Sequence, residues 1–556
     1  MMMSDSHSRV RILTVSVVAR GRLLNTKRAS TGEEPLNELA RLATLSLPTT
    51  GELITGAVKP TISSAFTGAF WQYSSYFLQA LAQFLVLTVL SRLLSAGEFG
   101  LISISMVFIN LSALFSQLGV GPALIQRKEI VAQHVNSAFT ISLIMGFIFF
   151  VVIYISSPSI AVFFGEPILR EVMRWIGCVF IFSGFGVVSE SLLTRHLRFR
   201  ALLVSNILSY VIGYAICGIV CAYFGLGVWS LVIANLVQNL VRSIIMYASM
   251  PHSLKFYIHW NEARELMNFG AGFTMTRLFN YGATEGDRFV IGKMLSVMSV
   301  GVYSRAYNLM MVMANQFGAT LEKVIFPVMA AYQQDKTRLQ SIYLSASSAV
   351  TFFTLPISIV FILYAPEIVR VVLGPGWQDV ILPFQLLTVS MTFRTAYKIG
   401  DSVAKAMGFV YQRSIREFIY AVFVVAGTYL GCKLGLVGAA SAVSLSIFLN
   451  FFMSTAMGCR ITGLSRMRFL RSQLPGMLIG LITLGLALSV RRGLLEMGVS
   501  GPGVLFLGGG LVGIVLLAII WLAPWLIGAE NRHLVQLIHG QMINNKWIAR
   551  GLAKFI

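Results

Sequence analysis

The sequence predicts an all-α polytopic membrane protein with about fourteen transmembrane helices. Hydrophobic residues make up 56% of the 556 positions, whereas charged residues make up only 12%, about half the share of a soluble domain. The mean hydropathy is +0.76. The apolar runs are about 20 residues long and show no alternation, which indicates membrane-spanning helices rather than the strands of a barrel.

The predicted spans follow one another with short connections, of which residues 250–267 form the longest. No folded domain fits outside the membrane, which argues against a membrane enzyme such as a glycosyltransferase, polymerase or ligase. In chain order the predicted spans are 66–91, 99–120, 135–157, 172–193, 201–223, 227–249, 268–294, 300–322, 341–364, 381–407, 414–433, 436–458, 473–491 and 503–527.

The distribution of basic residues predicts the orientation. With the N-terminus inside, the inner connections and the C-terminal segment hold more than twice as many lysines and arginines as the outer connections, as the positive-inside rule requires. Both termini are therefore expected in the cytoplasm. The formal charge of +21 is spread over many loops, so it does not indicate nucleic-acid binding.

A short internal similarity predicts that a six-helix unit has been duplicated. Residues 92–103 resemble 293–304 at an offset of 201, with identical pairs Leu94/Leu295, Ser95/Ser296, Gly100/Gly301 and Ser103/Ser304. The pair Gly225-Leu226 recurs as Gly435-Leu436. An even number of helices per unit makes the copies parallel, an architecture found in transporters.

The predicted organisation therefore has two parallel six-helix lobes around a central cavity, flanked by further segments. These are a disordered cytoplasmic tail (1–62), an N-terminal lobe (63–255), a C-terminal lobe (256–460), two additional transmembrane helices (461–530) and a cytoplasmic tail (531–556).

Span ten carries a stripe of charge. Arg394, Lys398, Asp401 and Lys405 recur at steps of four, three and four, which places them on one face of a helix. Each charge costs roughly 3 kcal/mol in the hydrocarbon on the gentlest scales, so the stripe must face a partner or a wet cavity. Its net positive sign predicts an anionic substrate, and Lys405 is close enough to the inner surface to reach it.

Span seven carries a second stripe, formed by Arg277, Tyr281, Glu285 and Arg288. Glu285 and Arg288 can pair along one face, while Asp287 points about 100° away toward a neighbour. Two interpretations remain open: the charges hold spans seven and ten together, or Arg277, Arg288, Arg394 and Lys398 bind phosphate. Arginine suits phosphate because its planar fork donates two hydrogen bonds at once.

The acids of these spans also have two interpretations. Glu285, Asp287 and Asp401 are candidates for ion coupling, because a buried carboxylate beside a cation can change its charge as a cavity wets and dries. Alternatively, each only neutralises a neighbouring cation. The five cysteines form no C-x-x-C pair and the histidines fall in loops or tails, so neither a metal site nor a cofactor is predicted.

Several motifs resemble the Wzx-like polysaccharide transporters of the multidrug/oligosaccharidyl-lipid/polysaccharide exporter superfamily. The resemblance covers about residues 66–460, and of the charged residues Asp287 and Arg288 carry over with it. Its motifs are Gly97-Glu-Phe-Gly-Leu101, Gly119-Val-Gly-Pro-Ala-Leu-Ile-Gln-Arg127, Arg195-His-Leu-Arg-Phe-Arg200, Gly286-Asp-Arg-Phe-Val-Ile-Gly292, Gly301-Val-Tyr-Ser-Arg-Ala-Tyr307, Phe326-Pro-Val-Met329 and Gly374-Pro-Gly-Trp377.

The resemblance implies a flippase of the bacterial inner membrane that moves undecaprenyl-pyrophosphate-linked oligosaccharides for exopolysaccharide or lipopolysaccharide biosynthesis. It also implies a polysaccharide polymerase and a chain-length regulator as partners. The alternative is a multidrug or organic-cation extruder of the same superfamily. The excess of basic over acidic residues within the spans argues against that alternative.

Overall fold

The computed structural model describes residues 62–116, 120–127, 130–499 and 501–522. All of them lie in one compact unit, Ala57–Ile556. Side chains are not described at 62–77, 116, 261–277, 313, 315–324 and 520. The described residues form helices and turns without strands, so the predicted all-α class is confirmed.

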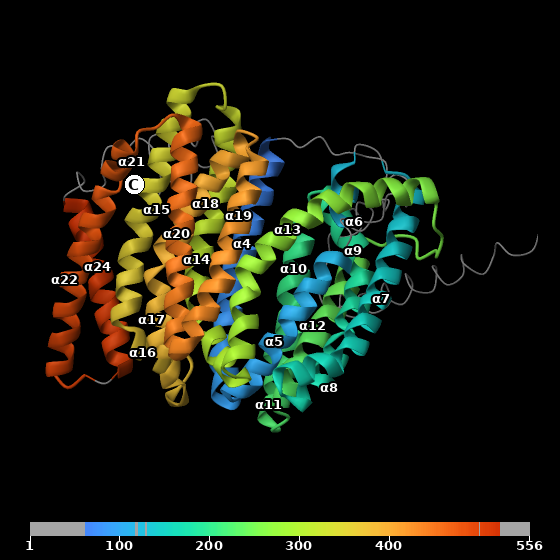
Figure 1. Ribbon diagram of the computed structural model, residues 1–556, viewed down its shortest axis with the longest axis horizontal. Helices are drawn as coiled ribbons and strands as arrows, with labels where there is room; N and C mark the ends of the chain where they lie inside the picture. Colours follow the sequence, from blue (N-terminus) through green and yellow to red (C-terminus); the bar gives the residue numbers. More distant parts are fainter. Residues whose placement is uncertain (1–61, 117–119, 128–129, 500, 523–556) are drawn as a thin grey trace, which may run out of the picture. The chain divides into compact units, whose positions relative to one another are not determined.

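The first half of the bundle runs from α4 to α12 (Figure 1). Its elements are α4 (Ile62–Leu93), α5 (Ala96–Ser116), α6 (Val120–Gln126), α7 (Ala132–Phe164), α8 (Pro167–Ile176), α9 (Val179–Arg195), α10 (Phe199–Tyr210), the π-helix η1 (Val211–Gly218), α11 (Ile219–Tyr223) and α12 (Val228–Ser249).

The second half begins at α13, and the chain then adds a final helical group. The elements are α13 (Trp260–Met294), α14 (Val297–Ala331), α15 (Lys336–Leu363), α16 (Ala365–Val372), η2 (Pro375–Val380), α17 (Ile381–Val389), α18 (Met391–Ala406), α19 (Val410–Gly431), η3 (Cys432–Leu434), α20 (Gly435–Thr462), α21 (Arg466–Ser472), α22 (Leu474–Glu496), α23 (Gly501–Gly503), η4 (Val504–Gly508) and α24 (Gly509–Leu522).

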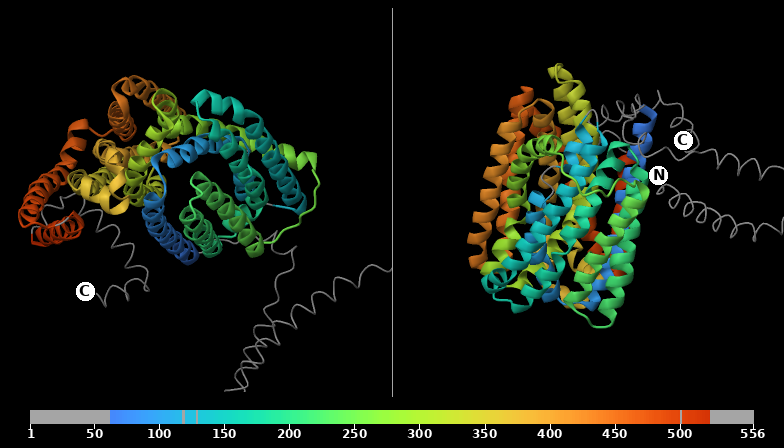
Figure 2. Two further views of the ribbon diagram at one scale, coloured as in Figure 1. Left: turned by 90° about the horizontal axis from the view of Figure 1, so that it is seen from below. Right: turned by 90° about the vertical axis from the view of Figure 1, so that its right-hand side faces the viewer.

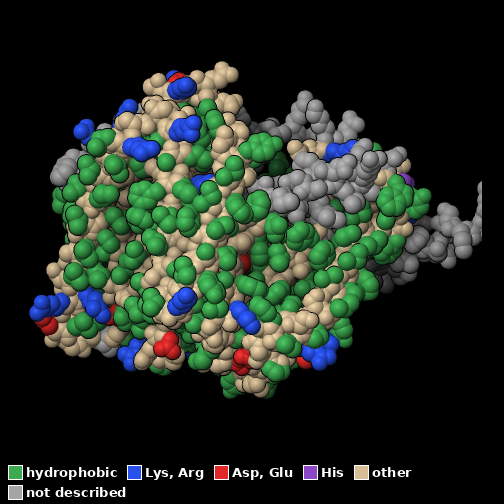
Figure 3. Space-filling model, viewed as in Figure 1, with side chains coloured by type: hydrophobic (Ala, Val, Ile, Leu, Met, Phe, Trp, Pro, Cys, Tyr) green, Lys and Arg blue, Asp and Glu red, His purple; other side chains and the backbone are tan. Residues whose placement is uncertain are grey.

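In the part of the chain that the structure describes, every predicted span falls on one of these helices or on a consecutive group; residues 117–119 and 523–527 of the predicted spans lie outside the described residues. Within the described residues, nine helical stretches are long and apolar enough to cross a membrane. The helix α18 is not among the nine and has only 16 residues. Figure 3 shows apolar side chains over the middle of one face, with most basic groups near its two ends, as a membrane-spanning bundle requires.

Two predicted spans are broken rather than continuous. The span predicted at 172–193 is a short amphipathic helix, α8, followed by a turn at Gly177-Cys178 and then α9. The span predicted at 381–407 is divided at Ser390 into α17 and α18, and the short helices α16 and η2 precede it. The sequence did not reveal α8 and α16 as separate helices, because a hydropathy window averages over a short helix whose one face is polar.

The structure supports the predicted duplication at the level of local geometry. Ser95 and Ser296 are equivalent by the offset of 201, and their hydroxyls accept hydrogen bonds from the backbone N–H groups of Glu98 and Ser299 at the starts of α5 and α14. The equivalent pair Gly225 and Gly435 have φ angles of 76° and 75°. Such matched caps and turns are expected of two copies of one unit.

The helices α5 and α14 also meet reciprocally. A Cβ atom on Gly100 would lie 1.9 Å from the carbonyl oxygen of Val297, and one on Gly301 would lie 1.8 Å from that of Ala96. Ala96 and Val297 are themselves separated by 201 positions, so each copy offers the same patch to the other. A two-fold relation between copies produces this kind of reciprocal contact.

A second set of contacts joins the two halves at the same end of the bundle, the lower end in Figure 1. Arg92 Nη2 donates to the Val371 carbonyl at 2.9 Å, and Trp377 Nε1 donates to the Ser91 carbonyl at 2.7 Å. The rings of Phe99 and Trp377 lie 5.7 Å apart. We call the contacts among Ser91, Arg92, Phe99, Val371 and Trp377 the end closure.

In the contacts that are described, the last helices pack only against the second half of the bundle. Figure 2 shows α22 and α24 at one edge, where α22 packs against α15. Arg491 forms an ion pair of 2.7 Å with the buried Glu367 of α16, and Thr351 donates to Gln473 at 2.6 Å. The predicted lobe boundaries themselves, at 255/256 and 460/461, stay predictions.

We call the close contacts of Gly100 and Gly301 with the facing helix the glycine crossing. These contacts yield a stability prediction. Gly100→Ala is expected to lower the free energy of unfolding by about 1–3 kcal/mol, because overpacking must push α5 away from α14. Gly97→Ala, in the same helix, is the matched control, because a Cβ there meets nothing within 4 Å. Thermal unfolding of the two detergent-solubilised variants measures the difference, and equal melting temperatures would contradict the prediction.

Candidate functional site

The charged residues of spans seven and ten meet at α14. This helix packs against α13 on one side and against α17 and α18 on another, so it brings together two stripes that are about 100 residues apart in the sequence. The meeting point is the buried ring of Tyr307. The Arg288 guanidinium carbon lies 5.0 Å from its centroid and that of Arg394 lies 5.1 Å from it. The predicted partnership of the two stripes is present in the structure.

The acids beside Arg288 are both engaged. Glu285 Oε2 lies 2.5 Å from Arg288 Nη1, which is the pair predicted from their spacing. Asp287 is only 2% exposed; it accepts a 2.5 Å hydrogen bond from the Tyr303 hydroxyl of α14 and a 2.8 Å bond from the Arg288 backbone N–H. Its contact with a neighbouring helix is as predicted. Arg288 Nε is buried without a hydrogen-bond partner, so this guanidinium retains donor capacity.

Arg394 differs from Arg288 because its described surroundings are aromatic rather than acidic. It is 5% exposed, and no described carboxylate lies within ion-pair distance of it. Its charge interacts with the hydroxyl groups of Tyr307, Tyr397 and Tyr420. The carboxylate of Asp287 also acts on this charge, but less than the three tyrosines do. A buried cation without a carboxylate at ion-pair distance can still attract an anion.

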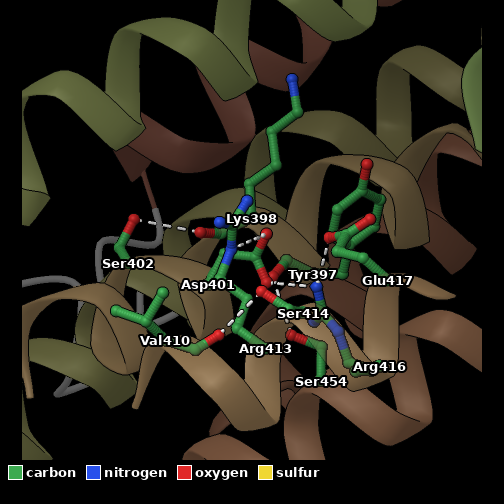
Figure 4. A network of polar contacts seen from close by, with 10 residues as sticks. All are labelled: Tyr397, Lys398, Asp401, Ser402, Val410, Arg413, Ser414, Arg416, Glu417 and Ser454. Carbon is green, nitrogen blue, oxygen red and sulfur yellow. Dashed lines mark hydrogen bonds and ion pairs between the residues drawn. The ribbon is translucent and has the colours of Figure 1, made fainter. Parts of the chain in front are cut away.

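The predicted stripe on α18 divides into two parts. Arg394 joins the group around Tyr307, whereas Asp401 faces α19 instead (Figure 4). Asp401 Oδ1 lies 2.5 Å from Arg416 Nη2, and Asp401 Oδ2 lies 3.4 Å from Arg413 Nε. Arg416 Nη2 also lies 2.6 Å from Glu417 Oε1. We call Asp401, Arg413, Arg416 and Glu417 the α18–α19 ion cluster.

The sequence missed three members of this cluster. None of Arg413, Arg416 and Glu417 was predicted from the sequence to take part in the site, although all three lie in α19. Arg416 and Glu417 are 5% and 3% exposed. The available signal was the step of four from Arg413 to Glu417, which places both on one face of a helix, as would be needed to meet the stripe on α18.

The other predicted residues are placed as follows. Lys398 is half-buried one turn from Arg394, and its side chain extends away from the Asp401 carboxylate in Figure 4. Arg277 lies in α13, but its side chain is outside the described residues, so its role in binding stays a prediction. Tyr281 donates its hydroxyl to the Val107 carbonyl of α5 and so serves helix packing.

No group of three or more His, Cys, Asp or Glu side chains suited to a metal ion occurs among the residues that the structure describes. The polar chemistry of the site is therefore that of guanidinium groups, tyrosine hydroxyls and paired carboxylates. Such a site can bind an anionic group and can form hydrogen bonds with hydroxyl groups of the same ligand.

Comparison with solved structures identifies the fold. Lipid II flippase MurJ in an inward closed conformation aligns with a TM-score of 0.66 at 15% identity, covering 82% of this chain and 99% of that one. A multidrug resistance MATE family transporter of the MOP superfamily, in an inward-facing conformation, aligns with a TM-score of 0.58 at 18% identity, covering 71% and 98%.

Curated relatives agree with the resemblance found in the sequence. Lipopolysaccharide biosynthesis protein WzxC of Escherichia coli is 24% identical over 66% of this chain and 73% of its own length. Teichuronic acid biosynthesis protein TuaB of Bacillus subtilis is 21% identical over 77% and 89%. Succinoglycan biosynthesis transport protein ExoT of Rhizobium meliloti is 23% identical over 53% and 60%.

The family described as "Polysaccharide biosynthesis protein" matches residues 89–382, more than half of the chain. This range contains α5, the glycine crossing and the charged helix α13, and it ends within α17. The chain belongs to the polysaccharide biosynthesis protein family of membrane transporters.

Proposed function

We propose that this protein moves undecaprenyl-diphosphate-linked oligosaccharide repeat units from the inner to the outer leaflet of the bacterial inner membrane. The repeat units serve exopolysaccharide or lipopolysaccharide biosynthesis. The observation that carries this proposal is the convergence of Arg288 and Arg394 on Tyr307, with Arg394 lacking a described carboxylate partner. Two guanidinium groups about one ring fit a diphosphate, because each can donate two hydrogen bonds to one phosphate.

The rest of the substrate follows from its chemistry. The polar oligosaccharide stays in water as it crosses, and the polyprenyl chain stays in the bilayer, because the free energy of each is lowest in that solvent. With both termini in the cytoplasm, the end closure lies on the outer side of the membrane. Release of the substrate outward then requires these contacts to separate. The protein acts as a transporter rather than as an enzyme, and a polymerase with its chain-length regulator consumes the product.

The carboxylates argue against extrusion of organic cations. Glu285, Asp287, Asp401 and Glu417 each have a basic or tyrosyl partner in the structure. A cationic drug would have to displace an arginine or a tyrosine from each of them. The roles of Glu285, Asp287 and Asp401 in ion coupling stay predictions, although the Arg413 and Arg416 contacts favour a counter-charge role for Asp401.

Reconstitution tests the proposal directly. Purified protein in liposomes is expected to make a fluorescent undecaprenyl-diphosphate oligosaccharide accessible to a reagent on the opposite side, at least tenfold faster than protein-free liposomes. The control substrate is the same oligosaccharide on a neutral lipid without the diphosphate, which should not be moved. Equal rates for both lipids would refute diphosphate recognition, and transport of an organic cation alone would favour the extruder.

A further inference from the structure

We propose that Arg305 forms a second phosphate-binding subsite beside the end closure, separate from the Arg288–Arg394 pair. The subsite deepens the proposed function and rests on it for the identity of the natural ligand. Its ligand chemistry is a phosphate group carrying unprotonated oxygens, as in the diphosphate of the lipid-linked substrate.

Arg305 lies in α14 two residues before Tyr307, but it points to different neighbours. Its guanidinium carbon lies 3.8 Å from the centroid of the Phe99 ring of α5. Phe99 is in turn in contact with Trp377 of the end closure. Arg305 therefore stands directly beside the contacts that join the two halves, whereas Arg394 is held at Tyr307.

The charge of Arg305 is poorly compensated in the structure. No described carboxylate lies within ion-pair distance of it, and its Nε atom is buried without a hydrogen-bond partner. The charge of Arg288 acts on it unfavourably. A buried guanidinium with an unused donor and no described carboxylate at ion-pair distance is stabilised when an anion enters beside it.

Neutral polar groups of the first half complete the surroundings. The hydroxyls of Tyr210 and Tyr214 interact electrostatically with Arg305, and their rings stack at 5.2 Å. Tyr214 accepts a 3.2 Å hydrogen bond from Asn235, which accepts one of 3.2 Å from Asn239. Tyr214 lies in the π-helix η1, a local irregularity that often occurs at functional sites.

The arrangement gives the two anion-binding positions different partners. At Tyr307 an anion is bound by helices α13 and α18 of the second half. At Arg305 it is bound by α14 together with Tyr210 and Tyr214 of the first half, next to the closure. A diphosphate that passes from the first position to the second thus reaches the predicted outer end, where it must leave.

The first experiment isolates the subsite from transport. In purified protein carrying Arg288→Gln and Arg394→Gln, binding of inorganic pyrophosphate is measured by calorimetry. Weak binding is expected to persist, to fall at least tenfold on adding Arg305→Gln, and to stay within about threefold on adding Arg305→Lys. Residual binding that is the same with and without Arg305, in variants with matching melting temperatures and elution volumes, overturns the subsite.

The second experiment identifies the ligand source. Undecaprenyl diphosphate in nanodiscs replaces inorganic pyrophosphate in the same titrations, and dependence on Arg305 for both ligands supports the subsite. Dependence for inorganic pyrophosphate alone overturns a role for it in the substrate path. In liposomes, Arg305→Gln in the otherwise native protein is expected to slow transport at least tenfold while lipid-diphosphate affinity changes less than threefold.

These outcomes separate the two proposals. If native protein fails to move the lipid-linked oligosaccharide, the proposed function fails, and the pyrophosphate titration still decides whether Arg305 binds an anion. If native protein transports and Arg305→Gln transports equally well, the subsite fails alone. Arg174→Gln is the matched control, because Arg174 already pairs with the half-exposed Glu171 of its own helix, and it should leave transport unchanged.

Discussion

Protein carrying both Arg288→Gln and Arg394→Gln is expected to lose at least 99% of its transport of lipid-linked oligosaccharide. A hydrogen bond to a charged group contributes roughly 1.5–3 kcal/mol, and about 1.4 kcal/mol corresponds to a factor of ten. Each substitution alone should therefore slow transport about tenfold or more. Initial rates in liposomes at equal protein density measure the effect.

The competing interpretation is that Arg288 only holds helices together through Glu285. The double variant Arg288→Gln/Glu285→Gln separates the two. If the pair is structural, removing both charges restores transport, because a buried pair replaced as a unit is often nearly neutral. If Arg288 binds phosphate, transport stays low. Recovery to near native rates would contradict the binding role.

Arg394 offers a complementary control because it lacks a described acidic partner. Arg394→Lys keeps the charge but loses the planar fork, so partial activity is expected, between that of native protein and Arg394→Gln. Tyr307→Leu should weaken both arginines at once by removing the ring that they share. An Arg394→Gln variant that folds and transports at the native rate would exclude Arg394 from the site.

Arg416→Met is expected to lower the free energy of unfolding by about 3–5 kcal/mol, because it leaves two buried carboxylates without their shared cation. Asp401 Oδ1 and Glu417 Oε1 lie 2.5 and 2.6 Å from the same nitrogen, Arg416 Nη2. Arg413 reaches Asp401 only at 3.4 Å, so it compensates poorly. Thermal unfolding in detergent, followed by size-exclusion chromatography, measures the loss.

The triple variant Arg416→Met/Asp401→Asn/Glu417→Gln tests whether the lost stability comes from the two unpaired carboxylates. It removes the stranded charges, so most of the lost stability is expected to return. Arg492→Met is the surface control: its pair with Glu496 is largely exposed, so the effect should stay below about 1 kcal/mol. A triple variant no more stable than Arg416→Met would show that the cluster is not held by charge compensation.

Much of the architecture could be predicted because the bilayer imposes strong local rules on a chain. Each span must satisfy its own backbone hydrogen bonds over about 20 residues, so apolar runs located the helices. The equivalence of Ser95 with Ser296 was visible in the sequence, and the structure shows both as helix caps. The short amphipathic helices α8 and α16 were not visible, because such a helix has no strong hydropathy signal.

The candidate site was predictable in part. Charge in an apolar helix is expensive enough to indicate that Arg288 and Arg394 must face inward, and a spacing of three predicted the Glu285–Arg288 pair. The partner of Asp401 was not predictable. Residues in the next helix approach α18 only after α18 and α19 pack side by side, and the sequence does not show which charge of that helix will face Asp401.

The sequence by itself determined that this is a duplicated helical membrane protein with surplus basic residues in its spans, and hence that an anion is its expected substrate. Helical periodicity and hydrocarbon solvation act locally, so they can be read along the chain. Only the tertiary structure decided which charges share a site. In the structure Arg288 and Arg394 both contact Tyr307. Asp401 pairs with Arg416, and Arg305 lies over the Phe99 ring. The sequence could not show these contacts, because packing between helices brings together residues that are far apart in sequence.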